Sequence, residues 1–161
     1  MHVHLFIRHG DRSPMYTLPN HVTPKLSCSL HDIDDEDAKT LISSMENLRS
    51  SLSKGSPLHR HNLYPRTKVC NGAMLTGQGA LQHAHIGKHL RQKYIDGHHL
   101  LLVNSTRHIF VRTSDYSRTF QSAMALLHGL VPKSDLSKLK LDIVQSTLMC
   151  SRASSGLPCA C

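Results

Sequence analysis

The sequence predicts an α/β fold with a mostly parallel sheet. Three short stretches with strand character, near residues 3–7, 108–112 and 139–144, are separated by segments whose apolar residues recur at helical spacing. Strands that alternate with helices along a chain are typical of a parallel sheet with helices on its faces. With 161 residues, 39% hydrophobic and 19% charged, the chain is long enough for a buried core and does not belong to the disordered class.

The three strands are predicted from local alternation. The first, Val3–Ile7, alternates with period two, as expected of a strand with one buried face. The second, His108–Arg112, shows the same pattern over a shorter run, and the third, Leu139–Val144, shows it more weakly.

The first helix is predicted over about residues 35–52, from apolar residues three and four apart. A cluster of acidic residues at 32–37 stands where this helix should begin. Acidic side chains in a first turn favour the positive end of the helix dipole. We therefore interpret the cluster as helix initiation rather than as a cation site.

Two further helices are predicted, from Thr76 to about Tyr94 and from Arg118 to Gly129. Asp115 is expected to cap the third helix, with orientation of Arg118 as the alternative role. The intervening segment Ser53–Gly72 is rich in Ser, Pro, Gly, Asn and His, so we expect a long loop with little regular structure.

The most informative motif, RHGDRSP at residues 8–14, directly follows the first predicted strand. In an open α/β sheet, ligands bind at the carboxyl ends of the strands. Arg8 and Arg12 are planar cations whose forked donors match phosphate oxygens. Gly10 lets the backbone come close to a ligand, and His9 is of a residue type that forms covalent intermediates. The motif therefore predicts a phosphate site.

This motif resembles the signature of the histidine acid phosphatases, a branch of the histidine phosphatase superfamily. Leu75–Tyr94 resembles the family's LTxxGxxQHxxLGxxLRxxY helix, and Val111–Thr119 resembles its VRSTDxxRT strand and turn. The resemblance implies a three-layer α/β sandwich with a mostly parallel sheet, like that of the phosphoglycerate mutases. Within the family, the sequence is most similar to the 2-phosphoxylose phosphatase branch, on the segments Cys28-Ser29-Leu30, LISSM, Leu63-Tyr64-Pro65, SRTFQSAMALLHGLVP and the Cys-rich stretch from Cys150.

The resemblance also implies residue roles. His9 would attack phosphorus and become phosphohistidine, while Arg8, Arg12 and Arg118 would bind the phosphoryl oxygens, without a metal or other cofactor. The implied substrate is a phosphorylated saccharide, the 2-phosphate of xylose in the glycosaminoglycan–protein linkage region. A general acid phosphatase or a phytase-like enzyme is the alternative.

One part of the family pattern is missing. The family takes its leaving-group proton from a His-Asp pair near the far end of the domain, and His31-Asp32 is the only such dipeptide here. It stands before the first helix, where we interpret it as helix-start chemistry. We therefore expect residues 1–161 to be the N-terminal part of a histidine acid phosphatase domain, incomplete at its C-terminus. We expect little turnover from it alone, because general-acid assistance contributes about 10²–10⁴-fold.

Cysteines and a sequon indicate the secretory pathway. Five Cys without a CxxC motif are typical of disulfide partners, and Asn104-Ser105-Thr106 is a candidate glycosylation site. We expect the Golgi lumen, with a lysosomal or secreted enzyme as the alternative. The 161 residues contain no signal peptide and no membrane span, so any membrane anchor would lie outside this chain.

The net charge of +8 leaves a second functional class open, a non-catalytic module that binds a polyanion such as a glycosaminoglycan. With only 4% aromatic residues and no known nucleic-acid motif, we do not expect nucleic acid as a partner. His85 and His89 are spaced i, i+4, as zinc ligands can be, but they lack a supporting Glu or Cys pair, so we predict no metal site.

Overall fold

The computed structural model describes residues 3–16, 19–20, 22, 25–99, 109–131, 136–137 and 139–144. Its strands are β1 (Cys28–Ser29), β2 (Arg66–Thr67), β3 (Phe110–Ser114) and β4 (Lys140–Val144). Its helices are α1 (Glu36–Ser51), α2 (Gly77–Leu90) and α3 (Ser117–Leu130), with short 3-10 helices at Leu30–Asp32 and Pro57–Arg60. A π-helical segment, Arg91–Gly97, extends α2.

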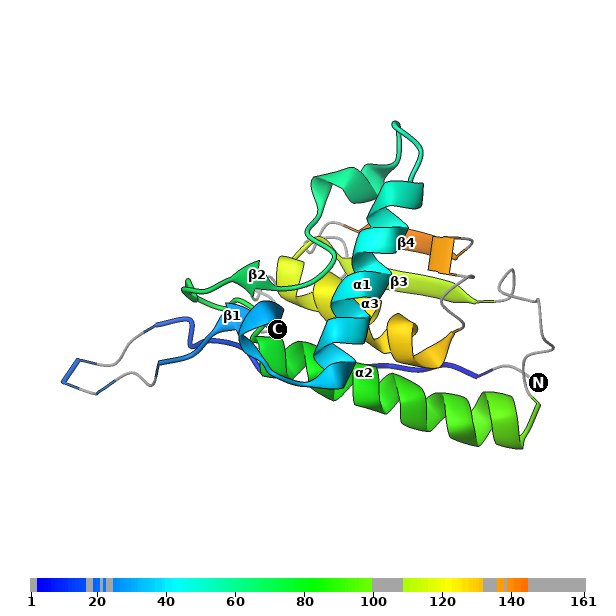
Figure 1. Ribbon diagram of the computed structural model, residues 1–161, viewed down its shortest axis with the longest axis horizontal. Helices are drawn as coiled ribbons and strands as arrows, with labels where there is room; N and C mark the ends of the chain where they lie inside the picture. The colour runs from blue at the N-terminus through cyan, green and yellow to red at the C-terminus, as the bar shows by residue number, and fades with distance from the viewer. Residues whose placement is uncertain are drawn as a thin grey trace, which may run out of the picture.

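The described strands form two small sheets. β1 and β2 pair antiparallel, whereas β3 and β4 pair parallel, with Phe110 opposite Lys140 and Ser114 opposite Val144. α3 lies between β3 and β4 in sequence, which makes this part a strand–helix–strand unit of the kind that parallel pairing requires. The predicted α/β class is confirmed. Figure 1 shows β3 beside β4, α1 crossing α3, and α2 along one side of the molecule.

The first predicted strand, Val3–Ile7, is wrong. Residues 3–10 do not form a strand, and Val3, Leu5 and Ile7, expected on a buried face, are 48%, 50% and 41% exposed. Alternation along a chain is a local pattern, but a strand also needs a neighbour to pair with. Among the described residues, no strand pairs with this segment.

The other two strands are found close to where they are predicted. β4 matches the third prediction within one residue, whereas β3 lies two residues further along than predicted. The polar end of β3 explains this shift. Thr113 and Ser114 are buried, and the Ser114 hydroxyl hydrogen-bonds Thr119 Oγ1 at 2.6 Å, so this part of the strand has no apolar pattern to detect.

The starts of α1 and α2 follow from side-chain caps. The Asp35 carboxylate accepts hydrogen bonds from the amides of Asp37 (2.7 Å) and Ala38 (3.3 Å), which confirms that the acidic cluster initiates a helix. The Thr76 hydroxyl accepts from the Gly79 amide at 2.9 Å and caps α2 in the same way. Both helices were predicted with nearly their observed bounds.

The start of α3 differs from the prediction in one respect. The N-cap position is occupied by Tyr116 rather than Asp115, and no side chain hydrogen-bonds there as a cap. Asp115 stands one residue too early for the capping role. The predicted cap is therefore wrong, although the helix itself is confirmed.

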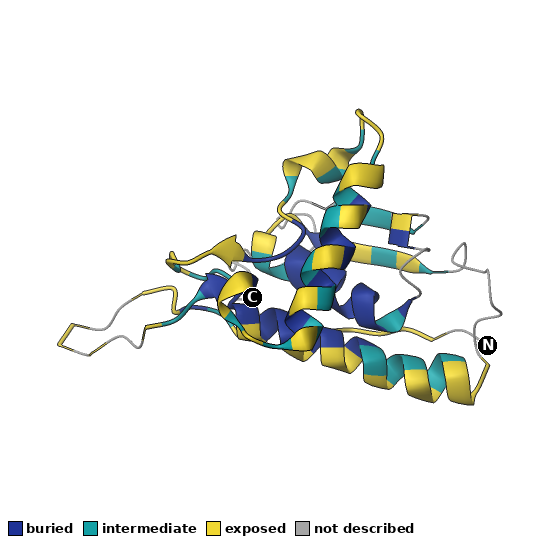
Figure 2. Ribbon diagram, viewed as in Figure 1, coloured by how far each residue is buried: buried dark blue, intermediate teal, exposed yellow. Residues whose placement is uncertain are grey.

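α3 is the centre of the core. Ten consecutive residues, from Phe120 to Gly129, are buried, as expected of a helix surrounded by other elements. Figure 2 shows the buried residues concentrated where α1, α2 and α3 meet, with exposed residues on the outer faces of α1 and α2. Two glycines let α2 and α3 approach closely. A Cβ on Gly87 would lie 2.1 Å from the Leu126 carbonyl oxygen, and one on Gly129 would lie 2.2 Å from that of Ala84.

A disulfide joins Cys28 to Cys70, across a sequence separation of 42 residues. This confirms disulfide chemistry for two of the five cysteines. A cross-link that closes a loop of this length stabilises the fold by about 4 kcal/mol in the chain-entropy account. The other three cysteines, Cys150, Cys159 and Cys161, and the sequon residue Asn104 lie outside the described residues. Of the helices in the described ranges, none has both the length and the apolar character needed to cross a membrane.

The close contact of α2 with α3 gives a testable prediction. We expect Gly87→Ala to lower the free energy of unfolding by about 1–3 kcal/mol, because the added methyl group would overlap the main chain of α3. Gly55→Ala is the control, since a Cβ there meets nothing within 4 Å, and it should change stability by less than about 1 kcal/mol. Urea unfolding followed by circular dichroism measures both. Equal losses in the two variants would contradict the packing described for α2 and α3.

Candidate active site

The segment that carries the RHGDRSP motif runs along α2 and against α3. The Gly10 amide donates to Ser122 Oγ on α3 at 3.0 Å, and the next amide, that of Asp11, donates to Gln82 Oε1 on α2 at 3.0 Å. Side chains from two different helices therefore hold consecutive amides of the motif. The motif is fixed by these side-chain contacts and by an isolated antiparallel bridge between Arg12 and Leu75, rather than by a place in one of the two sheets.

The start of α2 holds the second half of the motif. The Thr76 amide donates to the Asp11 carbonyl at 3.0 Å, and the Thr76 hydroxyl donates to Asp11 Oδ2 at 2.9 Å. The amide of Ser13 donates to the Met74 carbonyl at 2.8 Å. The residue that caps α2 thus also anchors the motif, which ties the position of the loop to the helix N-terminus.

Two glycines allow this close approach. A Cβ on Gly10 would lie 2.3 Å from the Gly79 carbonyl oxygen, and a Cβ on Gly79 would lie 2.2 Å from the Asp11 carbonyl oxygen. Real Cβ atoms do not come so near to backbone atoms. Any larger residue at either position would push the loop and α2 apart.

His9 has a defined tautomer in this arrangement. Its Nδ1 lies 2.8 Å from the Gly10 carbonyl oxygen. A carbonyl oxygen can only accept, so in this hydrogen bond Nδ1 carries the hydrogen. In the neutral ring, Nε2 is then unprotonated and has a free lone pair, which is the form a nucleophile needs.

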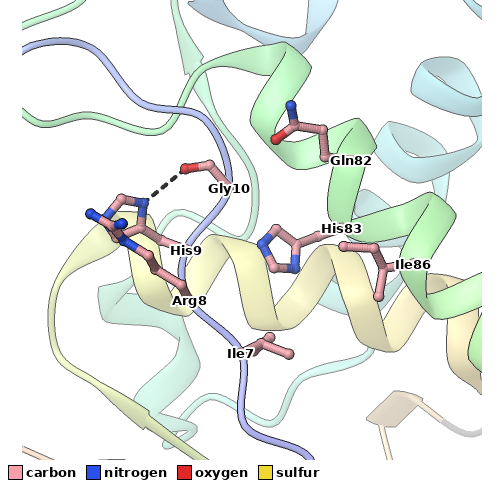
Figure 3. A pocket seen from close by; sticks show the side chains of 7 residues that line it. All are labelled: Ile7, Arg8, His9, Gly10, Gln82, His83 and Ile86. Carbon is pink, nitrogen blue, oxygen red and sulfur yellow. Dashed lines mark hydrogen bonds between the residues drawn. The ribbon is translucent and has the colours of Figure 1, made fainter.

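An open cavity of about 500 Å³ lies beside His9. It is lined by Ile7, Arg8, His9, Gly10, Gln82, His83 and Ile86. In Figure 3, the side chains of Arg8 and His9 extend to one side of the backbone segment, and the three α2 residues lie on the other. Arg8 is exposed and His9 is half-buried, so both are open to a ligand.

Arg12 and Arg118 lie outside the lining of this cavity. Arg12 Nη1 donates to the Ser13 carbonyl at 2.9 Å, and the Arg118 guanidinium lies 4.3 Å from the centre of the Tyr116 ring. The buried Nε of Arg118 has no hydrogen-bond partner among the described residues. The structure thus brings Arg8 and His9 together at the cavity, whereas Arg12 and Arg118 are not among the residues that line it.

The charge of these arginines is not balanced within the described part of the chain. Arg66, Arg91 and Arg112 each form an ion pair with a carboxylate, whereas no described carboxylate lies within ion-pairing distance of Arg8, Arg12 or Arg118. Unpaired guanidinium groups around one loop favour the binding of an anion there.

His83 is the buried ionisable group of the cavity. It is 3% exposed, and burial lowers its pKa; a hydrogen bond to the backbone of Arg8 works in the opposite direction, and the nearby His9 adds to the lowering. Folding therefore shifts the equilibrium of this ring toward its neutral form. The Nδ1 atom of His83 has no hydrogen-bond partner among the described residues.

Three residues that hold the loop, Ser122, Gln82 and His83, are not predicted as site residues from the sequence. Gln82 and His83 belong to the helix pattern at Leu75–Tyr94, which indicates no contact with the motif loop. Ser122 follows Arg118 by four residues, so the two lie on one face of α3. This spacing is the feature of the sequence that links Ser122 to a site residue, and it does not reveal the contact of Ser122 with Gly10.

His31-Asp32 lies away from the cavity, in the 3-10 helix before α1. His31 Nε2 lies 3.3 Å from the Tyr64 hydroxyl, which donates to Glu46 Oε1 at 2.6 Å. Burial, followed by the hydrogen bond to Glu46, raises the pKa of Tyr64 to about 12, so this hydroxyl keeps its proton. These contacts connect the 3-10 helix to α1.

His85, the first member of the i, i+4 histidine pair, contacts α1 instead of a metal ligand set. Its Nε2 lies 2.9 Å from Asp37 Oδ2, and Lys88 forms an ion pair with the same carboxylate. The hydrogen bond from Lys88 is the main reason that the pKa of Asp37 is lowered. In the described ranges, no three metal-ligating side chains come together.

Comparisons with known proteins identify related chains. The family described as the histidine phosphatase superfamily (branch 2) matches residues 1–156. Human 2-phosphoxylose phosphatase 1 is 37% identical over 156 residues, which cover 92% of this chain and 32% of that protein. Counting factor 60 of Dictyostelium discoideum is 29% identical over 143 residues, covering 84% and 33%. Human lysosomal acid phosphatase is 39% identical over 70 residues, covering 43% and 16%. The chain spans about a third of the length of the 2-phosphoxylose phosphatase that it matches.

The lowered pKa of His83 predicts a pH dependence of stability. Below about pH 6.5 the unfolded chain takes up a proton on this ring that the folded chain resists, so stability should fall as the pH falls. In His83→Gln this contribution is absent, and the free energy of unfolding should depend less steeply on pH between about 6.5 and 5. Urea unfolding at a series of pH values measures the two slopes.

Near pH 8 the His83 ring is neutral in both the folded and the unfolded chain. Measurements there give the change in the free energy of unfolding that the substitution itself causes. Parallel slopes for the two proteins at lower pH would show that burial does not perturb His83.

Proposed function

This chain belongs to the histidine phosphatase superfamily, branch 2, and we propose that His9 is its nucleophile in the hydrolysis of phosphomonoesters. The observation that carries the proposal is the 2.8 Å hydrogen bond between His9 Nδ1 and the Gly10 carbonyl. It supports a ring whose Nε2 lone pair is free to attack. The position of His9 at an open cavity, beside Arg8, supports access by a substrate.

In the first proposed step, Nε2 attacks phosphorus. A bond forms between Nε2 and phosphorus while the ester P–O bond breaks, and the leaving oxygen keeps its electron pair and takes a proton. In the second step, water attacks the phosphorus of phosphohistidine. The N–P bond breaks, its electron pair returns to Nε2, and inorganic phosphate leaves.

We assign the stabilisation of the phosphoryl group to Arg8, Arg12 and Arg118. Phosphoryl transfer depends on positioning and on stabilising the charge of the equatorial oxygens. The absence of carboxylate partners for these three side chains in the described part of the chain supports this assignment. The unpartnered Nε of Arg118 is a donor that a bound phosphate would satisfy.

The proton for the leaving oxygen needs a separate donor. The seven residues that line the cavity include no carboxylic acid. We propose that the donor corresponds to the His-Asp pair of the family, in a part of the relatives that this chain does not match. Without that proton donor, this chain would form phosphohistidine but would not efficiently release a poor leaving group.

For the substrate we propose the 2-phosphate of xylose in the glycosaminoglycan–protein linkage region. The 37% identity to human 2-phosphoxylose phosphatase 1 supports this choice, and the net charge of +8 is suited to an anionic saccharide chain. The 39% identity to human lysosomal acid phosphatase, over a shorter span, supports a general acid phosphatase as the alternative.

We propose a compartment of the secretory pathway, the Golgi lumen in particular, with Asn104 glycosylated. The disulfide between Cys28 and Cys70 supports an oxidising compartment, and the relative named lysosomal acid phosphatase supports the same pathway. In the same setting, exposed basic side chains would contact the glycosaminoglycan that carries the substrate.

The choice of leaving group tests the proposed chemistry. With 4-nitrophenyl phosphate, whose phenolate leaves without protonation, we expect the 161-residue chain to form phosphohistidine, detected as an acid-labile phosphoryl group on the peptide that contains His9. With xylose 2-phosphate, the phosphorylation rate should be lower by about 10²–10⁴-fold, because no general acid protonates the sugar oxygen.

His9→Ala should abolish phosphorylation by both compounds, and His89→Ala, an exposed histidine on α2, is the control that should not. If His9→Ala is phosphorylated as fast as the unmodified chain, the proposed nucleophile is wrong.

A further inference from the structure

We propose that Ser122 is a positioning residue for the nucleophile, an inference that rests on the role proposed for His9. Ser122 is fully buried in α3. Its Oγ accepts from the Gly10 amide at 3.0 Å and donates to the Arg118 carbonyl at 2.7 Å. One hydroxyl thus connects the loop that carries His9 to the helical turn that carries Arg118.

The direction of both hydrogen bonds is fixed. A serine hydroxyl has one hydrogen to donate and two lone pairs to accept with. The Arg118 carbonyl can only accept, so the hydroxyl hydrogen must point to it. A lone pair of the same oxygen then meets the Gly10 amide, which can only donate.

The path continues from Gly10 to the nucleophile. The carbonyl of Gly10 accepts from His9 Nδ1 at 2.8 Å. The hydrogen bonds therefore run from the His9 ring to Gly10, from the Gly10 amide to Ser122, and from Ser122 to Arg118. Ser122 therefore holds Gly10 at a fixed position relative to the first turn of α3. The carbonyl of Gly10 in turn orients the imidazole of His9.

Other serines in helices of this chain show what a purely local role would look like. Ser50 and Ser51 in α1 donate to carbonyls three or four residues earlier, at 3.1 Å for Ser50 to Glu46 and 2.8 Å for Ser51 to Leu48. Ser122 makes the same kind of local bond to Arg118. Its second bond, to a residue 112 positions earlier in the chain, is what indicates a role at the site.

The test compares three variants by the rate of phosphohistidine formation from 4-nitrophenyl phosphate and by the free energy of unfolding. Ser122→Ala removes both hydrogen bonds, and we expect phosphorylation to slow on the order of 10²-fold, as for a small misplacement of a reacting group. Ser122→Thr keeps a hydroxyl able to bond both partners and should restore most of the rate.

Ser44→Ala is the matched control. Ser44 is also a buried serine in a helix, in α1, but its Oγ has no hydrogen-bond partner among the described residues. Its substitution should leave the phosphorylation rate unchanged. A rate that followed only the loss of stability across the three variants would assign Ser122 a structural role and overturn the inference.

Two further outcomes are separable. If the unmodified chain forms phosphohistidine and Ser122→Ala forms it equally fast, the inference fails and the proposed function stands. If the unmodified chain forms none, the proposed function fails, and the role of Ser122 fails with it.

Hydrogen exchange covers the case in which Ser122→Ala does not fold. The Gly10 amide of the unmodified chain should exchange slowly with solvent, because it donates to a buried oxygen. Exchange as fast as that of an unprotected amide would overturn the inference without any variant.

Discussion

The backbone contact between Gly10 and Gly79 is the constraint on which the rest of the site depends. Neither position has room for a Cβ, which would lie 2.3 Å or less from a main-chain atom of the other segment. At this separation, Thr76 and Gln82 of the α2 region reach Asp11, and Ser122 of α3 reaches Gly10. The two helices are in turn held together through a second pair of glycines, Gly87 and Gly129. These four glycines thus allow the close packing that positions His9, the proposed nucleophile.

This construction explains why the site has its form without a supporting strand. The segment before His9 pairs with no strand in the described structure, so contacts with α2 and α3 set the position of His9. His83 bonds the backbone of Arg8, and Ser122 and Gln82 hold the amides of Gly10 and Asp11. In the proposed function, Arg8, Arg12 and Arg118 bind the phosphoryl group beside this loop. Arg8 flanks His9 at the cavity, whereas Arg118 is held over the Tyr116 ring with a donor unpaired in the described structure. A bound phosphoryl group would complete both the charge balance and the hydrogen bonding of this region.

The sequence predicts the elements that depend on a local pattern of residues, above all the three helices. The three helices have apolar faces with regular spacing, and the caps Asp35 and Thr76 are local signals, so these elements were predicted with nearly correct bounds. The strand at Val3–Ile7 was wrong because pairing depends on a partner elsewhere in the chain. The motif identified His9 and its arginines as candidates, but not Ser122, whose contact joins residues 112 positions apart. Likewise, five cysteines do not specify that Cys28 pairs with Cys70.

In the proposed function, the motif loop and the first turn of α3 form one phosphate site. The most direct measurement is a titration of the isotope-labelled chain with inorganic phosphate, followed by nuclear magnetic resonance. The account predicts that the Gly10 amide and the Arg118 Nε–H shift together with a single dissociation constant. It also predicts that Arg118→Ala weakens binding, whereas Arg91→Ala, which removes an arginine already paired with Asp96, does not. Shifts at the loop without any at Arg118, or equal binding by Arg118→Ala, would contradict the claim.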